Sequence, residues 1–453
     1  MSPKKTTLTT ALMLTCVVLV SLLSAASGSA SPAAKASRPG VRLGTRATSA
    51  PAELPSRTAF SVFAASVLTN PAPVKATDGK VHLVYELVLT NVTPAKLRID
   101  AVQVLNSRTQ RVLLSLRHQA LAANVRPVGG AEASGSGDVG DLDRLPSLAA
   151  AAPTSRVGGV TVGGSQSVIV WIDVRVRNYA AVPKVLAHRV IASFVSPPPG
   201  APASLSQSLI RVPTVRHRPI VLGPPVRADA GDWYANEGCC DPETHHRGGL
   251  ISINGRLLVP QRFAIDWFLL DSRHRAWVGS PSRLSSYLSY RQPAIAAAAG
   301  TVVRTKDGLP NNPDIPQPPK IPAIQNTVGN NVVLRVSPGV YLLYGHFQPG
   351  SVRVHVGERV RRGQVLGLIG TSGNSTTPHL HFQVMTTPTF FPTDSPPYVF
   401  RRFTVRGRVP KRIWDDNLGL QPTGVLPFVR ARNRTIGRRE MPLDREVISF
   451  KGH

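Results

Sequence analysis

The pair His379 and His381, in the run Pro378-His379-Leu380-His381-Phe382, is the strongest candidate for chemistry in the sequence. In a β-strand, residues two apart face the same side, so both imidazoles would point into one groove while Leu380 and Phe382 pack on the other side. Two neighbouring imidazoles suit a metal site, or a metal ligand beside an acid–base group. Taken alone, the pair is equally compatible with a structural role.

Two more polar residues lie in apolar, strand-like runs. His346 ends the run 340–346, and the glycine-rich turns that follow would fold the chain back and bring this histidine towards the His379–His381 strand. Asp266 lies inside the apolar run 263–267, where a buried carboxylate requires a partner, and a metal ion is one good partner.

The order and glycine-rich spacing of these motifs resemble the lysostaphin-type zinc metallopeptidases, a family best known for bacterial peptidoglycan endopeptidases. The resemblance covers about 294–384, with a looser extension to Asp266. It implies Zn²⁺ as the cofactor, Asp266 and His381 as metal ligands, and His346 and His379 as catalytic residues. It further implies zinc-activated water as the nucleophile, with His379 as the expected base and His346 on the tetrahedral intermediate.

One position departs from the family pattern. The first motif of the family is His-x-x-x-Asp with both ends on zinc, but the residue four before Asp266 is Arg262, which cannot ligate a cation. We expect a substitute ligand from the cysteine- and histidine-rich segment upstream, where either His245 or His246 could supply it. Gln261 is a weaker candidate, because an amide oxygen binds zinc less well than imidazole does.

Two other function classes compete with the peptidase. Loss of zinc at the position of Arg262 would leave a degenerate homologue that binds cell wall or regulates another wall hydrolase. The hairpin-like run 356–364 also resembles a biotinyl or lipoyl carrier domain, but such a domain needs an attachment lysine, and none occurs between Lys320 and Lys411.

The elements that must position these residues are all β. Short runs rich in Val, Leu and Ile, several of them alternating with polar residues, predict an N-terminal β-sandwich followed by a lysostaphin-type antiparallel β-sheet metallopeptidase domain. The predicted strands are 60–68, 81–90, 97–105, 112–116, 168–176, 185–195 and 209–215, then 263–270, 294–304, 331–336, 340–346, 364–369 and 380–385. The stretch 122–165 is expected as a long loop, and 310–322, with six prolines, as a surface insertion.

These patterns divide the chain into five parts. They are a signal peptide at 1–30, a flexible linker at 31–57, an Ig-like β-sandwich at 58–221, the metallopeptidase domain at 232–396 and a basic C-terminal extension at 397–453. The extension could pack beside the catalytic domain or lie on an anionic polymer. No segment after the signal is long enough to span a membrane.

The composition agrees with an exported protein. The chain has 453 residues and a formal net charge of +28, and its 42% hydrophobic residues exclude a wholly disordered chain. Peptidoglycan or another anionic cell-wall polymer is the expected partner, and the expected location is extracellular and cell-wall associated. Nucleic-acid binding is not expected, because the basic segments lack interleaved aromatic residues. Three cysteines exclude a disulfide scaffold, and Cys239 and Cys240 are expected as a vicinal disulfide or two buried thiols.

Overall fold

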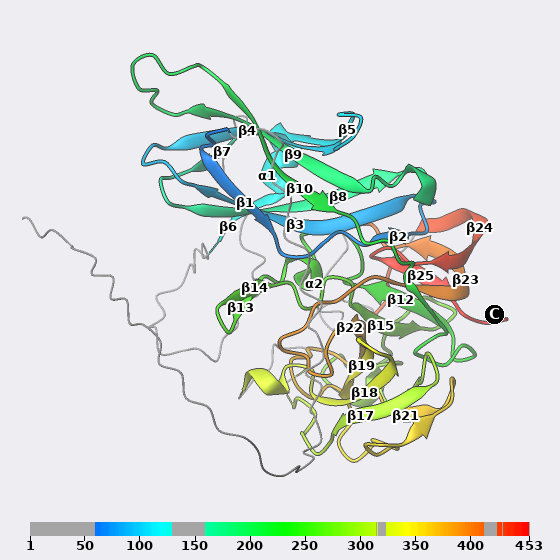
Figure 1. Cartoon of the computed structure of the whole chain (residues 1–453). Coiled ribbons are helices and arrows are strands. Elements are labelled where there is room, and N and C mark those ends of the chain that lie inside the picture. Colours follow the sequence, from blue (N-terminus) through cyan, green and yellow to red (C-terminus); the bar gives the residue numbers. More distant parts are fainter. Residues whose placement is uncertain are drawn as a thin grey trace, which may run out of the picture. The chain divides into compact units, whose positions relative to one another are not determined.

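The computed structural model describes residues 59–128, 159–313, 315, 323–411, 424–427 and 429–452. The signal peptide and linker expected before residue 58 lie outside these residues. Strands dominate the described chain and helices are short, so the predicted all-β class is confirmed (Figure 1). No helix in these ranges combines the length and apolar character that crossing a membrane requires.

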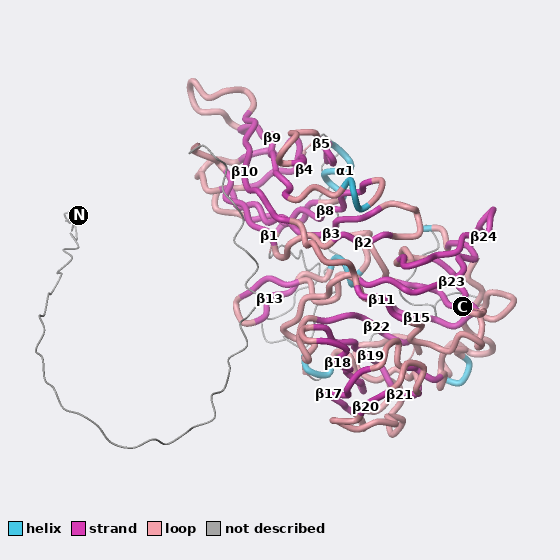
Figure 2. The backbone as a smooth tube through the Cα atoms, turned by 45° about the vertical axis from the view of Figure 1, so that its right-hand side comes forward, coloured by secondary structure: helices cyan, strands magenta, loops and turns pink. Residues whose placement is uncertain are grey.

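The first part of the described chain forms two five-stranded sheets (Figure 2). One sheet contains β1 (Phe63–Val67), β2 (Pro73–Lys75), β3 (Val81–Asn91), β6 (Val125–Pro127) and β8 (Ser167–Val176). The other contains β4 (Leu97–Asn106), β5 (Val112–Arg117), β7 (Val160–Val162), β9 (Val185–Phe194) and β10 (Leu205–Pro213). Apolar residues of both sheets meet in one core, as alternating strands require. The Ig-like assignment of 58–221 stays a prediction.

The prediction of a long loop at 122–165 is partly wrong. The end of α1 (His118–Ala123) and strands β6 and β7 lie within that stretch. Each of the two strands pairs with one of the sheets, β6 with β8 and β7 with β4. Their short apolar runs, Val125–Pro127 and Val160–Val162, are too brief to show a period in the sequence. The residues between them, 129–158, lie outside the described chain.

The second part is built on one eleven-stranded sheet. Its main path runs β11-β23-β25-β12-β15-β22-β19-β18-β17-β20, and β24 pairs with β23. The strands are β11 (Ile220–Leu222), β12 (Asp232–Asn236), β15 (Ile265–Leu270), β17 (Gly300–Lys306), β18 (Asn330–Ser337), β19 (Val340–Phe347), β20 (Arg359–Val360), β22 (Leu380–Met385), β23 (Tyr398–Arg408), β24 (Val429–Glu440) and β25 (Glu446–Ser449). Two small sheets, β13 (Ile251–Ile253) with β14 (Arg256–Leu258) and β16 (Pro293–Ile295) with β21 (Val365–Leu368), and the short helix α2 (His245–Gly248) complete it.

The strand predicted at 294–304 is two strands in different sheets, β16 and β17. The break falls at Ala296 and Ala297, whose backbone N–H groups donate to the carbonyl of Gln364 and to the hydroxyl of Tyr344. Because these donors are used by other segments, they cannot continue a ladder. Both alanines pack in the main core. As apolar residues within an apolar run, they did not indicate this break in the sequence.

The basic C-terminal segment packs within the second sheet. Of the two alternatives left open for 397–453, packing beside the catalytic part is the one observed: β25 hydrogen-bonds to both β12 and β23. The buried aromatic rings of Phe400 and Phe450 pack at 5.7 Å from Trp267 on β15. The boundary expected after residue 396 therefore falls inside one continuous sheet.

This packing makes the C-terminal segment essential for stability. Phe450→Ala should lower the free energy of unfolding by about 3–5 kcal/mol, because it removes a fully buried ring from the core. The same substitution at Phe60, which is 84% exposed, should change it by less than about 0.5 kcal/mol. Urea unfolding of both variants measures the difference, and equal midpoints would show that the C-terminal ring is not part of the core.

Candidate metal centre

Three neighbouring strands bring the predicted site residues together. Asp266 on β15 is the direct register partner of His381 on β22. On the other side of β22, Gly345 of β19 is the register partner of His381, and His346 follows it. His379 immediately precedes β22. Asp266, His346, His379 and His381 are all at least 94% buried and meet at one place in the sheet.

The protonation of His381 follows from its neighbour two residues on. The amide nitrogen of Gln383 donates to the carbonyl of Pro260 over 2.9 Å, which turns the amide oxygen of Gln383 towards Nε2 of His381, also at 2.9 Å. Since an amide oxygen only accepts, Nε2 of His381 carries a proton. The other ring nitrogen, Nδ1, therefore presents its lone pair to the Asp266 carboxylate, 2.9 Å away.

His246 reaches the same carboxylate from the short helix α2. The Thr244 hydroxyl accepts from the backbone N–H of Arg247 and so caps the first turn of this helix. Nδ1 of His246 donates to the carbonyl of Glu237 over 3.1 Å, which leaves Nε2 unprotonated. Nε2 lies 3.5 Å from Asp266 Oδ2 and has no hydrogen-bond partner within the described residues.

The structure thus distinguishes the two histidines that the sequence offered as substitute ligands. His246, Asp266 and His381 present ligand atoms that all lie within 4.8 Å of one another, and all three residues are buried. His245, by contrast, lies on the outer side of α2, where its Nδ1 is 3.1 Å from the carboxylate of Glu237 and its side chain is 37% exposed. The structure therefore brings His246 together with Asp266 and His381, and places His245 beside Glu237 instead.

Three lone pairs that face one another repel unless a cation lies between them. Burial raises the pKa of the Asp266 carboxylate, but positive charge beside it, which His379 and His246 supply only when protonated, outweighs burial and holds that pKa well below its ordinary value. Burial lowers the pKa of His246 well below its ordinary value, which disfavours a proton as the bridging cation. The donor set therefore calls for a metal ion.

The donors fit zinc in kind. Two imidazole nitrogens and one carboxylate oxygen are a usual zinc set at catalytic sites. The two histidine nitrogens face different oxygens of Asp266: Nδ1 of His381 lies 2.9 Å from Oδ1, and Nε2 of His246 lies 3.5 Å from Oδ2.

His379 and His346 are held beside this group in matching ways. Nδ1 of His379 donates to the carbonyl of Thr377 and Nδ1 of His346 to the carbonyl of Ser372, both over 2.8 Å. In the neutral form of each ring, Nε2 is therefore the unprotonated nitrogen. Nε2 of His379 is buried, lies 3.4 Å from Asp266 Oδ2 and has no hydrogen-bond partner among the described residues. The two ring centroids are 4.7 Å apart, so a pair of basic nitrogens accompanies the ligand set.

Two glycines allow the close approach that positions His346. A Cβ on Gly329 (φ +60°) would lie 2.1 Å from the carbonyl oxygen of Ser372, and a Cβ on Gly373 (φ +79°) would lie 2.3 Å from the backbone nitrogen of Gly329. Only glycine permits this contact, which holds the Ser372 carbonyl against His346. His346 itself has φ of +62°, a conformation uncommon for residues with a side chain and often found at functional sites.

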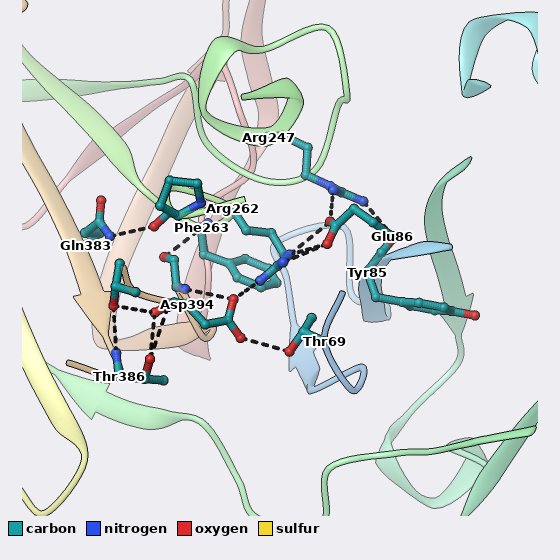
Figure 3. A network of polar contacts seen from close by, with 12 residues as sticks. Thr69, Tyr85, Glu86, Arg247, Arg262, Phe263, Gln383, Thr386 and Asp394 are labelled. Atoms are coloured by element: carbon teal, nitrogen blue, oxygen red, sulfur yellow. Dashed lines mark hydrogen bonds and ion pairs between the residues drawn. The ribbon is translucent and has the colours of Figure 1, made fainter. Parts of the chain in front are cut away.

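Arg262 contacts other acidic residues instead of the metal centre. Its buried guanidinium forms ion pairs with Glu86 of β3 and with Asp394, and Glu86 also pairs with Arg247 of α2 (Figure 3). Burial lowers the pKa of Arg262, but Asp394 and Glu86 more than offset it and raise that pKa above its ordinary value. This residue therefore stays charged and cannot serve as a ligand.

Cys239 and Cys240 form a disulfide, one of the two states expected for them. They line a cavity of about 540 Å³ together with Asp78, His82 and Asp173. None of the four histidines around Asp266 lines that cavity.

The residues that orient the histidines were not predicted from the sequence. These are Gln383 and the carbonyls of Glu237, Ser372 and Thr377. A signal existed for Gln383, which lies two residues after His381 and so on the same side of β22. The three carbonyls belong to loops or strand ends, whose placement no local pattern predicts.

Comparisons with known proteins agree on one family. Residues 287–391 match the model of Peptidase family M23. His346, His379 and His381 lie inside the match, and Asp266 and His246 precede it. A 58-residue stretch is 43% identical to the glycyl-glycine endopeptidase ALE-1 of Staphylococcus capitis, covering 13% of this chain and 16% of that protein. A 55-residue stretch is 42% identical to the DD-carboxypeptidase/endopeptidase Mpg of Neisseria meningitidis serogroup B, covering 12% of each.

These matches span less than a fifth of the length of the curated relatives. Among solved structures, the catalytic domain of lysostaphin from Staphylococcus simulans is 24% identical, covers 32% of this chain and 80% of its own, and has a TM-score of 0.20. The metalloprotease pseudoalterin is 14% identical, covers 49% of this chain and 96% of its own, and has a TM-score of 0.24.

The buried histidines predict how the stability of the metal-free protein depends on pH. Burial, with the neighbouring His379 and His381, lowers the pKa of His346 well below 6.5, its ordinary value. Below pH 6.5, His346 therefore binds a proton in the unfolded chain but not in the folded one, so the free energy of unfolding falls as pH falls. The slope is at most about 1.4 kcal/mol per pH unit for this histidine.

His346→Gln should therefore make the free energy of unfolding less dependent on pH between 5 and 6.5. His355→Gln, at a side chain that is 84% exposed, should keep the wild-type slope. Urea unfolding of zinc-free protein at several pH values measures both slopes. An unchanged slope for His346→Gln would contradict the prediction.

Proposed function

We propose that this chain, whose residues 287–391 carry a Peptidase family M23 domain, is a secreted zinc metalloendopeptidase that hydrolyses peptide cross-links of bacterial peptidoglycan. The observation that carries the proposal is the convergence of His246, Asp266 and His381, which present three unprotonated ligand atoms within 4.8 Å in a buried place. Such a set has no evident structural use without a cation.

Asp266, His246 and His381 would hold the zinc ion. Three protein ligands leave one further position, as catalytic zinc sites require. When bound, zinc supplies a Lewis acid that polarises the scissile carbonyl and lowers the pKa of water. The Gln383 amide keeps His381 in the tautomer whose Nδ1 is free, a role typical of residues behind metal ligands.

His379 is the better placed base. Its Nδ1 proton is fixed on the Thr377 carbonyl, so a proton taken from the attacking water enters at Nε2. There the Asp266 carboxylate, 3.4 Å away, stabilises the resulting charge. The protonated ring can then deliver the proton to the leaving amine. Through this exchange His379 serves both halves of the hydrolysis.

His346 would contact the tetrahedral intermediate. Its Nδ1 donates to the Ser372 carbonyl and its pKa is lowered, so Nε2 stays unprotonated and can accept a hydrogen bond from the hydroxyl group that the attacking water contributes. Neither His379 nor His346 is among the proposed zinc ligands, so removal of either should leave zinc in place. Because each presents a basic nitrogen, its removal should impair proton transfer.

Cell-wall peptides as substrate are supported by several independent observations. Both curated relatives are named as endopeptidases, one of them for glycyl-glycine bonds. The N-terminal 30 residues have the pattern of an export signal, and the net charge of +28 favours an anionic polymer. A secreted, wall-associated enzyme accounts for all three.

Metal analysis tests the ligand assignment. The protein lacking residues 1–30 should contain about one zinc ion per chain. His246→Ala and Asp266→Ala should lose it, because each removes one of three ligands. His245→Ala, the neighbouring histidine on the same helix, is the matched control and should retain it. Zinc retention in His246→Ala, or loss in His245→Ala, would overturn the choice between the two histidines.

Activity measurements test the catalytic roles. His379→Ala and His346→Ala should each retain zinc but lower the rate of amino-group release from purified peptidoglycan by about 10²- to 10⁴-fold, because contributions from acid–base catalysis and from contacts to the tetrahedral intermediate are of this size. Loading each variant to the same zinc content before the assay separates loss of chemistry from loss of metal. A zinc-loaded wild-type protein that releases no amino groups would refute the proposed activity on this substrate.

A further inference from the structure

A group of buried charges connects the N-terminal sheets to the segment that carries His246. Glu86 lies in the middle of β3 and is fully buried. It forms ion pairs with two arginines from the other part of the chain, Arg247 and Arg262, which are also buried (Figure 3). A carboxylate left unpaired in such a place is strongly unfavourable, so the three groups depend on one another.

Arg247 is anchored in the N-terminal sheet by the two terminal nitrogens of its guanidinium. One nitrogen pairs with Glu86, and another donates to the carbonyls of Tyr85 and Ile172 over 3.1 Å and 3.3 Å. Tyr85 and Ile172 are register partners in the ladder between β3 and β8, so this arginine is fixed against both strands. Its Cζ also lies 4.8 Å from the centre of the Trp171 ring.

Arg247 directly follows His246 on the four-residue helix α2. A helix this short has little stability of its own, so its position depends on contacts with other segments. Arg247 supplies the contacts on one side, while the Glu237 carbonyl holds the His246 ring on the other. The apolar cluster of Ile169 and Trp171 with Val259 adds packing between the same two parts of the chain.

Arg262 connects the same carboxylate to the departure from the family motif. This residue stands where the motif has its first ligand, and its side chain bonds to Glu86 over 2.7–3.1 Å instead of reaching Asp266. One glutamate therefore binds both the arginine that occupies the ligand position and the arginine next to the histidine that could replace that ligand.

We propose that Glu86 is a positioning residue for the metal centre: through Arg247 it fixes α2 and thereby the placement of His246. The inference rests on the proposed role of His246 as a zinc ligand. It gives the N-terminal sheets a task in building the metal centre. Residues behind a metal ligand typically contribute 10- to 100-fold to metal affinity.

The test compares zinc affinity in full-length variants by competition with a chromophoric chelator. Glu86→Gln should weaken zinc binding about 10- to 100-fold, because the shape is kept while the charge that holds Arg247 is lost. Arg247→Lys should weaken it in the same direction, since lysine keeps the charge but cannot form the forked contacts. If Glu86→Gln does not fold, Arg247→Lys tests the positioning role in its place.

Asp394→Asn is the matched control. It removes the other acidic partner of Arg262 and leaves Arg247 untouched, so it should retain wild-type zinc affinity. Cobalt substitution gives a second readout: the visible absorption of bound Co²⁺ should change in Glu86→Gln and Arg247→Lys, and stay as in wild type in Asp394→Asn. A purely structural role of the network would lower stability in all three variants and leave affinity and spectrum alone.

His246→Ala, measured in the same assay, separates the ligand assignment of His246 from the positioning role of Glu86. If His246→Ala weakens zinc binding while Glu86→Gln and Arg247→Lys keep wild-type affinity and spectrum, the positioning role is refuted and the ligand assignment stands. If His246→Ala binds zinc as wild type does, both the ligand assignment and the positioning role are refuted.

Discussion

The candidate site depends on the interactions of one group, the carboxylate of Asp266. It lies in a strand with no exposed residue, and three histidine nitrogens approach its two oxygens within 3.5 Å. Each of these histidines is fixed through its other nitrogen, to Gln383, to the Glu237 carbonyl or to the Thr377 carbonyl. Because those outer partners determine which nitrogen is protonated, the surroundings of the site specify its chemistry as much as the four residues themselves do.

The same surroundings accommodate the departure from the metallopeptidase motif. Arg262 stands where the resemblance implies the first ligand, and a buried glutamate from a different sheet, Glu86, neutralises its charge. The same glutamate pairs with Arg247, the residue after His246 in α2. In the proposed site, the arginine and the histidine that would take its place as a ligand are therefore linked through one carboxylate.

How much of this could be predicted from the sequence differs between residues. The strand carrying His379–His381, the strand ending at His346 and the acidic residue in an apolar run each have a local pattern, and the structure places all of them together. The choice between His245 and His246 had no local pattern, because both lie on one four-residue helix and only the direction of its axis separates them. The role of β23 was hidden by its arginines: none of them is buried, whereas Tyr398, Phe400 and Phe403 of the same strand are.

The order of strands in the large sheet has a consequence for when the site forms during synthesis. β25, which ends at Ser449, pairs with β12, which begins at Asp232, so the two are among the most distant partners in the sheet. β12 in turn borders the Asp266 strand and ends one residue before Glu237, whose carbonyl orients His246. Pairing across so long a chain segment comes late in folding. The surroundings of Asp266 are therefore incomplete until β25 has been made, and a partly synthesised chain carries no assembled site.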